Sequence, residues 1–442
     1  MRCPQLPKEV VFREDVDNSV IIYKIMPGRA FRIRTKTKTE AEGIIKLLAT
    51  LKKEQATIEM LSKVSGLDRT FVQKLCRELY KKILGATKVI YADSTIDQKP
   101  KLPDLELSVP LFLELIITYR CNLRCRHCLV GDLRYSEDAD MPLELVRKIA
   151  SEVRKYSIFE VVLTGGEPTI RKDFFTILEW LSDSGAFIAV TTHGLTLSRR
   201  KIERMRDYNI FKYVVSLEGA TSETHDFIRG NGTFDAVIRT IERIRNYTES
   251  IIELNVTCGK HNIGEIEDIV NLAYRIGAQI VNFSRLRPWG WGASLRPYLL
   301  DSSEISFLNR KIKELREKYK DIYIGGDMPI MVERQAFVCD AMFAFTIQPN
   351  GNVLPCTTFE QLPTAEVILG NANNQDIAGI WNSEKARAMR RRIQHHSDVY
   401  HTCISAGCPI HSVCAKTYCL AEWFISTRTL SSDLSKCATY RT

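Results

Sequence analysis

Apolar segments typical of buried strands alternate with amphipathic helical segments from residue 111 to about residue 320. The strand segments are 111–118, 160–164, 187–192, 213–217, 252–257 and 280–283, and helical spacing fills stretches between them such as 143–155, 174–184 and 234–247. Strands alternating with helices indicate βαβ units and a parallel sheet. Six units are too few for a closed eight-stranded barrel, so the pattern predicts an α/β fold with a partial (β/α)6 barrel that is open on one side.

A cysteine triad with the spacing C-x3-C-x2-C follows the first of these strands, at Cys121, Cys125 and Cys128. In α/β barrels the active site lies at the carboxyl ends of the strands, where this triad falls. Three thiolates on one short loop can hold three corners of a 4Fe–4S cluster and leave the fourth iron open to a small molecule. A zinc site is the alternative, but zinc sites usually pair two short clusters to reach four ligands. His127 could be a fourth ligand, although its ring would crowd its neighbours.

The triad, its place after a first strand, and the string Gly165-Gly166-Glu167-Pro168 at the end of the second strand resemble the radical S-adenosylmethionine (SAM) enzymes. The resemblance extends from residue 111 to the C-terminus. It implies that SAM chelates the open iron and that one electron cleaves it to a 5′-deoxyadenosyl radical, which abstracts a hydrogen atom from the substrate. It also implies an electron donor such as flavodoxin or ferredoxin.

The resemblance further implies SAM contacts at these strand ends. Two glycines allow close backbone approach, and an arginine fork can pair a carboxylate bidentately. The alternatives are a simple chain reversal for the glycines and a surface position for the arginine. The chain departs from the commonest family pattern at His193, where asparagine is frequent, and at Glu218, where aspartate is, but both keep a polar group. The implied SAM contacts are Gly165, Gly166, Glu167, Ser216 and Arg229.

Seven of the thirteen cysteines lie in the last quarter of the chain. They resemble the SPASM extension of radical SAM enzymes, which implies two auxiliary clusters and three 4Fe–4S clusters in all. The inner cluster has no fourth cysteine ligand. One hypothesis is that Asp340, another side chain or water occupies the fourth ligand position. The sharper hypothesis is an open iron that binds a substrate thiolate. The implied ligands are Cys403, Cys408, Cys414 and Cys437 for the outer cluster and Cys339, Cys356 and Cys419 for the inner one, with wider spacings than usual at 403–408 and 414–419.

The N-terminal segment has a different pattern. Short strands at 10–25 and 30–33, a turn at Pro27-Gly28, a helix at 39–51 and a second helical pair around Gly66 predict a winged helix-turn-helix-like domain over residues 1–95. Residues 96–110 are the expected linker, followed by the radical SAM core at 111–320 and the SPASM domain at 321–442. Residues 1–100 carry 20 Lys and Arg against 12 Asp and Glu, a net charge of +8.

Nucleic-acid binding is one hypothesis for a basic module, but its second helix lacks a dense basic face and Glu78 interrupts it. The module instead resembles the leader-peptide recognition domains of enzymes that modify ribosomally made peptides. There the leader adds as a strand to an exposed sheet edge, and a basic module would suit an acidic leader. The resemblance therefore implies a precursor peptide as the partner, bound through its leader.

Composition indicates the class of protein and its expected compartment. Hydrophobic content of 45% and charged content of 26% are ordinary for a soluble globular protein. An apolar run long enough for a transmembrane helix is missing, and the N-terminus lacks a signal peptide's apolar core. We therefore expect a cytoplasmic protein without a membrane partner, in which cysteines serve as metal ligands and not as disulfides.

Together these features predict a peptide maturase that forms a thioether crosslink between a cysteine sulfur and a carbon of a ribosomal precursor. Carbon–carbon crosslinking and epimerisation are alternatives in the same class. Sulfatase-type oxidation is less favoured because Thr357 follows Cys356 where that group has an aspartate. Porphyrin side-chain modification in haem maturation would have little use for a leader-binding module. A DNA-binding regulator with a redox-sensing enzyme is the remaining alternative.

Overall fold

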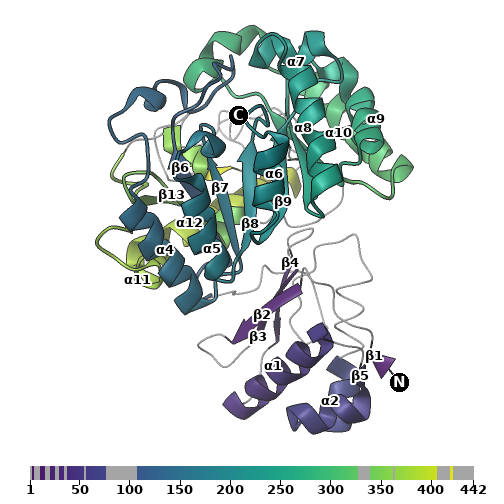
Figure 1. The fold of residues 1–442 in the computed structure, drawn as a ribbon, viewed down its shortest axis with the longest axis vertical. Helices are drawn as coiled ribbons and strands as arrows, with labels where there is room; N and C mark the ends of the chain where they lie inside the picture. The colour runs from purple at the N-terminus through teal and green to yellow at the C-terminus, as the bar shows by residue number, and fades with distance from the viewer. Residues whose placement is uncertain are drawn as a thin grey trace. The chain divides into compact units, whose positions relative to one another are not determined.

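A computed structural model defines the fold (Figure 1). The contacts between residues divide the chain into two units, Met1–Leu111 and Phe112–Thr442. Each unit is described by itself. The structure describes residues 2–3, 10–14, 20–24, 29–33, 37–53, 56–75, 107–326, 339–361, 364–405 and 419–421.

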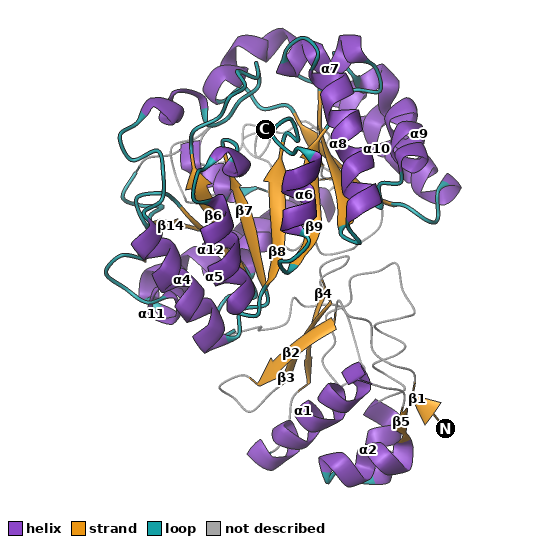
Figure 2. Cartoon of the chain, viewed as in Figure 1, coloured by secondary structure: helices purple, strands orange, loops and turns teal. Residues whose placement is uncertain are grey.

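The first unit combines a small antiparallel sheet with short helices (Figure 2). Strands β2 (Val10–Glu14), β3 (Val20–Lys24) and β4 (Arg29–Ile33) form a three-stranded meander, in which Phe12 lies opposite Ile22 and Ile22 opposite Phe31. A two-residue pairing joins β1 (Arg2–Cys3) to β5 (Ala56–Thr57). The predicted turn at Pro27-Gly28 lies outside the described residues. The winged-helix assignment as a whole stays a prediction.

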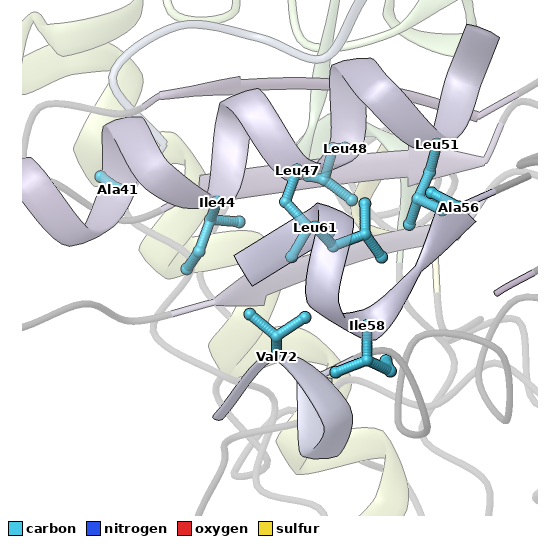
Figure 3. Packing of buried hydrophobic residues seen from close by; sticks show 9 residues of the cluster. All are labelled: Ala41, Ile44, Leu47, Leu48, Leu51, Ala56, Ile58, Leu61 and Val72. Carbon is cyan, nitrogen blue, oxygen red and sulfur yellow. The ribbon is translucent and has the colours of Figure 1, made fainter. Parts of the chain in front are cut away.

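Helix α1 (Lys38–Lys53) and helix α2 (Ile58–Ser65) build the core of the first unit (Figure 3). Apolar residues three and four positions apart fall on one face of a helix, and α1 uses this spacing to bury Ile44, Leu47, Leu48 and Leu51 completely. Leu61 of α2 packs into the same cluster. After α2, Gly66 adopts a φ of +70°, which suits a glycine at a helix end.

A single ten-stranded sheet forms the framework of the second unit. Its strand order is β12-β11-β10-β9-β8-β7-β6-β13-β14-β15. Neighbours from β12 to β13 pair in parallel, and β14 and β15 extend the sheet as antiparallel strands. The strands are β6 (Phe112–Thr118), β7 (Glu160–Gly165), β8 (Phe187–Thr192), β9 (Ile210–Ser216), β10 (Ile251–Cys258), β11 (Ile280–Arg285), β12 (Tyr323–Gly326), β13 (Ala344–Ile347), β14 (Asn352–Leu354) and β15 (Gly370–Asn371).

Helices that connect the parallel strands cover one side of this sheet (Figure 2). The helices of the unit are α4 (Leu143–Tyr156), α5 (Phe174–Asp183), α6 (Arg199–Met205), α7 (Ser222–Arg229), α8 (Thr233–Tyr247), α9 (Ile266–Ile276), α10 (Ser302–Lys318), α11 (Ile377–Asn382) and α12 (Glu384–Ser405). Contacts join α5 to β8, α8 to β9 and β10, α9 to β11 and α10 to β12. This arrangement follows from βαβ connections, which return each helix to a face of the sheet.

Strand β10 shows how the two faces of the sheet differ. Its residues alternate between half-buried and buried from Ile251 to Cys258. The buried set, such as Leu254 and Val256, is apolar, whereas Glu253 on the opposite face pairs with Lys212 of β9 at 3.0 Å. Successive side chains of a strand point to opposite faces. One face of β10 therefore belongs to the core, and the other carries polar groups.

The six strands that the sequence predicts are present as β6 to β11, but the sheet is larger than the predicted (β/α)6 partial barrel. Strand β12 adds a seventh parallel strand in succession, and β13 pairs in parallel with the far side of β6. The predicted number of six βα units in the barrel is therefore not confirmed. Strand β12 escapes sequence analysis because it has four residues, and Gly325 and Gly326 are two of them. In the described part of the chain no helix has the length and apolarity needed to cross a lipid bilayer.

Candidate functional site

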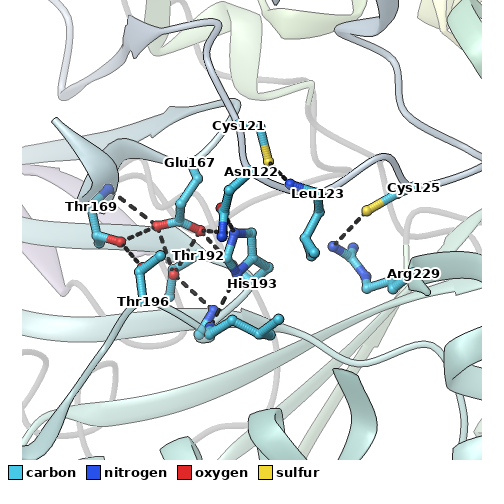
Figure 4. A network of polar contacts seen from close by, with 12 residues as sticks. Cys121, Asn122, Leu123, Cys125, Glu167, Thr169, Thr192, His193, Thr196 and Arg229 are labelled. Atoms are coloured by element: carbon cyan, nitrogen blue, oxygen red, sulfur yellow. Dashed lines mark hydrogen bonds and ion pairs between the residues drawn. The ribbon is translucent and has the colours of Figure 1, made fainter. Parts of the chain in front are cut away.

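The cysteine triad lies on the loop after β6, at the carboxyl end of the parallel strands (Figure 4). The loop is held by its own backbone, because the amide of Cys128 donates to the carbonyl of Cys125 at 3.2 Å. A second bond, from the amide of Arg126 to the carbonyl of Ile228 at 2.9 Å, ties it to the end of α7. Cys125 is buried and the other two cysteines are half-buried, and all three are free thiols.

Burial and neighbouring charges shift the pKa values of these thiols. Burial raises the pKa of Cys121 to about 11. Burial also raises the pKa of Cys125, although the Arg229 guanidinium opposes this. Arg229 Nη1 lies 3.8 Å from the Cys125 sulfur, and Arg134 Nη2 lies 3.5 Å from the Cys128 sulfur. Thiols of this kind lose their protons when metal binds them.

Three thiols on one loop with two guanidinium groups beside them fit an iron–sulfur cluster, which takes cysteine thiolates and carries negative charge. Among the described residues, no three His, Cys, Asp or Glu side chains converge on a point where a single metal ion could bind. The cysteines of the triad are the residues that would hold such a cluster.

Gly165 and Gly166 allow two backbone segments to approach each other closely. Their strand end pairs with the loop that leads to the triad, because the amide of Gly166 donates to the carbonyl of Thr118 at 2.8 Å. A Cβ atom on Gly165 would lie 2.0 Å from the carbonyl oxygen of Thr118, and one on Gly166 would lie 2.3 Å from that of Arg120. The glycines therefore allow β7 to approach the backbone of the triad loop. Their predicted contact with SAM stays a prediction.

The Glu167 carboxylate is completely buried and joins the turn after β7 to the end of β8 (Figure 4). It accepts hydrogen bonds from the amide of Thr169 at 3.1 Å, from the hydroxyl of Thr192 at 2.9 Å and from the amide of His193 at 2.9 Å. These bonds fix the end of β8 against the turn after β7. The sequence suggested Glu167 as a SAM contact, which stays a prediction, and the structure adds this bracing role.

His193 occupies the position where asparagine is frequent in related enzymes. Its Nδ1 accepts from the amide of Leu195 at 3.1 Å, and its Nε2 lies 2.8 Å from Asn122 Oδ1 in the triad loop. Burial lowers the pKa of His193, so a neutral ring that donates from Nε2 satisfies both contacts. The histidine thus links the end of β8 to the loop that carries the cysteines.

Arg229 and Glu218 form a buried ion pair beside Cys125. The Nε and Nη2 atoms of Arg229 donate to Glu218 Oε1 at 2.9 and 2.6 Å, and the amide of Thr257 donates to Glu218 Oε2 at 2.7 Å. Burial acts to raise the pKa of Glu218, but the charges of Arg229 and His127 and the amide bond lower it to about 2. Two of the guanidinium nitrogens are thus engaged by protein, and Nη1 faces the triad.

His127 lies between the last two cysteines of the triad and close to Glu218, with its Nε2 atom 3.5 Å from Glu218 Oε1. Burial lowers the pKa of His127 to about 4, although the Glu218 carboxylate acts in the opposite direction. The imidazole is therefore neutral at neutral pH. Arg229 is then the cation that balances the Glu218 carboxylate.

The predicted SAM contacts gather at the ends of β7 and β9 and in the segments that follow these strands. Gly165 ends β7 and is followed by Gly166 and Glu167, Ser216 ends β9 and is buried, and Arg229 ends α7. Parallel strands place their carboxyl ends at one edge of the sheet. The structure therefore brings these residues to the same edge as the triad, and their binding of SAM stays a prediction.

Two of the C-terminal cysteines, Cys356 and Cys419, lie near a third, Cys339. Burial raises the pKa of Cys339 well above its usual value, and the neighbouring thiolates of Cys356 and Cys419 add to the effect. Cys403 lies in α12, although its side chain is not described. Cys408, Cys414 and Cys437 lie outside the described residues. The division of these cysteines between two clusters stays a prediction.

Sequence reasoning missed several side chains that shape the site. Arg134 reaches the Cys128 sulfur, Trp291 packs on Arg134, and Thr192 holds Glu167. Thr192 ends a predicted strand, which is a position where its hydroxyl could have been suspected. The string Trp289-Gly290-Trp291-Gly292 after the sixth strand is a second signal, because alternating glycines indicate close backbone approach.

Two family models match this chain. Residues 115–273 match the radical SAM superfamily, and residues 339–409 match SPASM, described as an iron–sulfur cluster-binding domain. The first match contains the triad and the predicted SAM contacts. The second contains Cys339, Cys356, Cys403 and Cys408.

The chain is also similar to curated proteins. It is 30% identical over 189 residues to the mycofactocin maturase MftC of Mycobacterium ulcerans, which is 43% of this chain and 51% of the relative. It is 23% identical over 283 residues to the PqqA peptide cyclase of Bradyrhizobium diazoefficiens, which is 63% of this chain and 74% of the relative. The match thus spans about half the length of MftC.

Among solved structures, the fold resembles that of SuiB from Streptococcus suis bound to the precursor peptide SuiA. The TM-score is 0.64, the sequences are 16% identical, and the match covers 97% of this chain and 98% of SuiB. At this identity the likeness concerns the fold alone.

Proposed function

We propose that this chain, which matches the radical SAM superfamily over residues 115–273 and SPASM over residues 339–409, modifies a ribosomally made precursor peptide by forming a thioether between a cysteine sulfur and a carbon atom. The observation that carries this proposal is the placement of Cys356 and Cys419 close enough to Cys339 for their thiolates to raise its pKa. Three protein ligands on a four-iron cluster leave one iron for a fourth thiolate. A substrate cysteine has the chemistry to fill that place.

Peptides are the proposed substrates for two reasons. The relatives include a protein named a peptide cyclase, and a protein of the same fold was solved with its precursor peptide. The first unit of this chain also has a three-stranded antiparallel sheet, and sheets of this type can accept a peptide as an added strand. Its net charge of +8 over residues 1–100 would favour an acidic leader.

When bound, SAM and the triad cluster supply a 5′-deoxyadenosyl radical that takes a hydrogen atom from the substrate. The residues of this chain orient and enclose that chemistry. Glu167 braces the ends of β7 and β8, and His193 holds the triad loop through Asn122. Arg229 keeps one guanidinium nitrogen toward Cys125 while Glu218 holds the other two. Buried dipoles and charges of this kind act without reorganising during the reaction.

The remaining parts of the proposal concern the wider context. We propose three 4Fe–4S clusters, one at the triad and two in the SPASM domain, held by the cysteines that the sequence indicates. An electron donor such as flavodoxin or ferredoxin would reduce the triad cluster. The site would function in the cytoplasm, where reduced thiols remain available as metal ligands.

The first test is mass spectrometry of a precursor peptide encoded near this gene, after anaerobic reaction with reconstituted enzyme, SAM and dithionite. A thioether removes two hydrogen atoms and consumes one thiol, so the product should resist alkylation by iodoacetamide at that cysteine. The matched control is a precursor with its cysteines changed to alanine. A product that loses two hydrogen atoms but keeps every thiol would contradict thioether formation.

A carbon–carbon crosslink is the second candidate, favoured by the similarity to a peptide cyclase. It predicts the same mass loss with all thiols still open to alkylation. An epimerised peptide would keep its mass and incorporate deuterium from heavy water. The mass and the alkylation pattern therefore separate the three peptide reactions.

A second test examines the inner group of cysteines directly. The sample is enzyme in which a triad cysteine is changed to alanine, so that the auxiliary clusters alone give the electron paramagnetic resonance signal. Precursor with intact cysteines should change this signal, because a thiolate would bind the open iron. Precursor with alanine at those positions should leave it unchanged. Identical spectra with the two peptides would remove the basis for the thioether proposal.

A further inference from the structure

A short segment far along the chain packs directly on the triad loop. This segment, Trp289-Gly290-Trp291-Gly292, follows β11 and begins the 3₁₀ turn Gly290–Tyr298. The amide of Trp291 donates to the carbonyl of Cys128 at 3.0 Å. Gly290 has a φ of +53°, and a Cβ atom there would lie 2.6 Å from the carbonyl oxygen of Cys128. The segment therefore approaches the loop as closely as backbone can.

Trp291 in turn holds Arg134. The guanidinium carbon of Arg134 lies 4.4 Å from the centre of the Trp291 ring, a cation–π geometry. The indole Nε1 of Trp291 donates to Asp132 Oδ1 at 3.0 Å. Arg134 Nε donates to the carbonyl of Gly131 at 3.1 Å, and Nη2 reaches the Cys128 sulfur at 3.5 Å. These contacts fix the guanidinium plane between an indole ring and a cysteine of the triad.

The charge of Arg134 has no carboxylate partner within ion-pairing distance in the described part of the chain, and the residue is only 6% exposed. A buried cation is costly unless an anion balances it. The neighbouring groups of opposite charge are the cysteines, and the positive charge of Arg134 acts on both Cys121 and Cys125 as well. An anionic cluster on the triad would therefore be the counter-charge of Arg134.

We propose that Arg134, held in place by Trp291, is a positioning residue that raises the reduction potential of the cluster on the triad. Reduction adds negative charge to the cluster, and a fixed cation in a water-poor site stabilises that charge. Arginine keeps its charge at any pH at which the protein is folded. The potential therefore falls when this charge is removed. The inference rests on the assignment of the triad cluster in the proposed function.

The experiment is a redox titration of reconstituted full-length enzyme, followed by electron paramagnetic resonance. The signal that disappears in the Cys125→Ala variant belongs to the triad cluster. We expect Arg134→Gln to lower the ratio of reduced to oxidised cluster at a fixed potential about tenfold, which for one electron is a shift of about 59 mV to a more negative potential. Arg126→Gln is the matched control, because Arg126 lies in the same loop and packs on the Phe227 ring at 4.2 Å, but is exposed to water. Its shift should be much smaller, since water screens its charge.

A second pair of variants tests whether Trp291 acts through Arg134. Trp291→Leu should shift the potential in the same direction as Arg134→Gln, and the double variant should shift it no further than Arg134→Gln alone. Additive shifts would show that Trp291 does not act through Arg134. If Arg134→Gln loses iron, Trp291→Leu and Arg134→Lys replace it. Trp291→Leu should lower the potential, and Arg134→Lys, which keeps the positive charge, should change it less. A wild-type potential in Trp291→Leu would then overturn the proposal.

The outcomes also separate this inference from the proposed function. If the Cys125→Ala variant loses none of the signals of the wild-type enzyme, the triad assignment itself is refuted. A signal lost in Cys125→Ala but unshifted in Arg134→Gln, or shifted no more than in Arg126→Gln, would refute only the role of Arg134.

Discussion

The buried ion pair between Glu218 and Arg229 offers a quantitative test of the second unit. Replacing Glu218 by glutamine keeps the shape of the side chain and removes its charge. Glu218 is 1% exposed and Arg229 12% exposed. The variant thus leaves a buried guanidinium without its carboxylate, the situation in which breaking one partner of a buried pair costs about 3–5 kcal/mol.

The pKa of Glu218 gives an independent value for this loss of stability. It falls from 4.5 to about 2 in the folded protein. At 1.36 kcal/mol for each pKa unit, this shift corresponds to roughly 3 kcal/mol of stability when the carboxylate is ionised. The folded pKa lies below the unfolded one, so this stability is fully present above pH 4.5 and is lost as the pH falls toward 2. The wild type and Glu218→Gln should therefore converge in stability within that window.

Urea unfolding followed by tryptophan fluorescence is a suitable assay, because all five tryptophans lie in the second unit. We expect Glu218→Gln to lower the free energy of unfolding by about 3 kcal/mol at neutral pH. The matched control is Glu203→Gln, which removes the exposed pair with Arg199, where the N–O distance is 2.8 Å. An exposed pair contributes about 0–1 kcal/mol. Equal losses in the two variants would show that Glu218 is not held as an ionised buried carboxylate.

Three further predictions concern the site and the two units. Changing any cysteine of the triad to alanine should abolish reductive cleavage of SAM and lower reconstituted iron by about four atoms per chain; retained formation of 5′-deoxyadenosine would refute the assignment. Deleting residues 1–95 should leave uncoupled SAM cleavage nearly intact and reduce precursor modification, because the predicted SAM contacts all follow residue 110; normal modification by the truncated enzyme would refute leader binding. Gly166→Ala should cost about 1–3 kcal/mol of stability through overpacking and reduce iron binding, whereas Gly264→Ala, with no atom within 4 Å of the added Cβ, should do neither; iron analysis and urea unfolding would contradict this if the two variants behaved alike.

Sequence analysis recovered the parts of this fold that depend on local pattern. The six strands from β6 to β11 fall within a few residues of their predicted positions, because apolar runs between amphipathic helices mark them clearly. The triad and the Gly165-Gly166-Glu167 turn fall at strand ends for the same reason. Strand β13 was missed because its pairing with β6 joins segments far apart in the chain.

Interactions between distant segments account for most of what sequence analysis missed at the site. Trp291 and Asp132 are 159 positions apart, so their hydrogen bond leaves no local pattern. Arg229 was assigned to SAM from its residue type, and its buried bond to Glu218 depends on how α7 packs beside the end of β9. The atoms that the glycines at 165 and 166 avoid belong to the end of β6 and to the loop that follows it, which sequence spacing alone does not identify.

The alternation along β10 has a consequence for which of its residues can be varied. Residues such as Leu254 and Val256 are buried in the core, while Glu253, Asn255 and Thr257 stand on the other face. A library that varies only the second set leaves the buried apolar side chains of the strand in place, because successive side chains of a strand point to opposite faces. Within eight consecutive residues, one face is therefore fixed by packing in the core, and substitutions on the other face leave that packing unchanged.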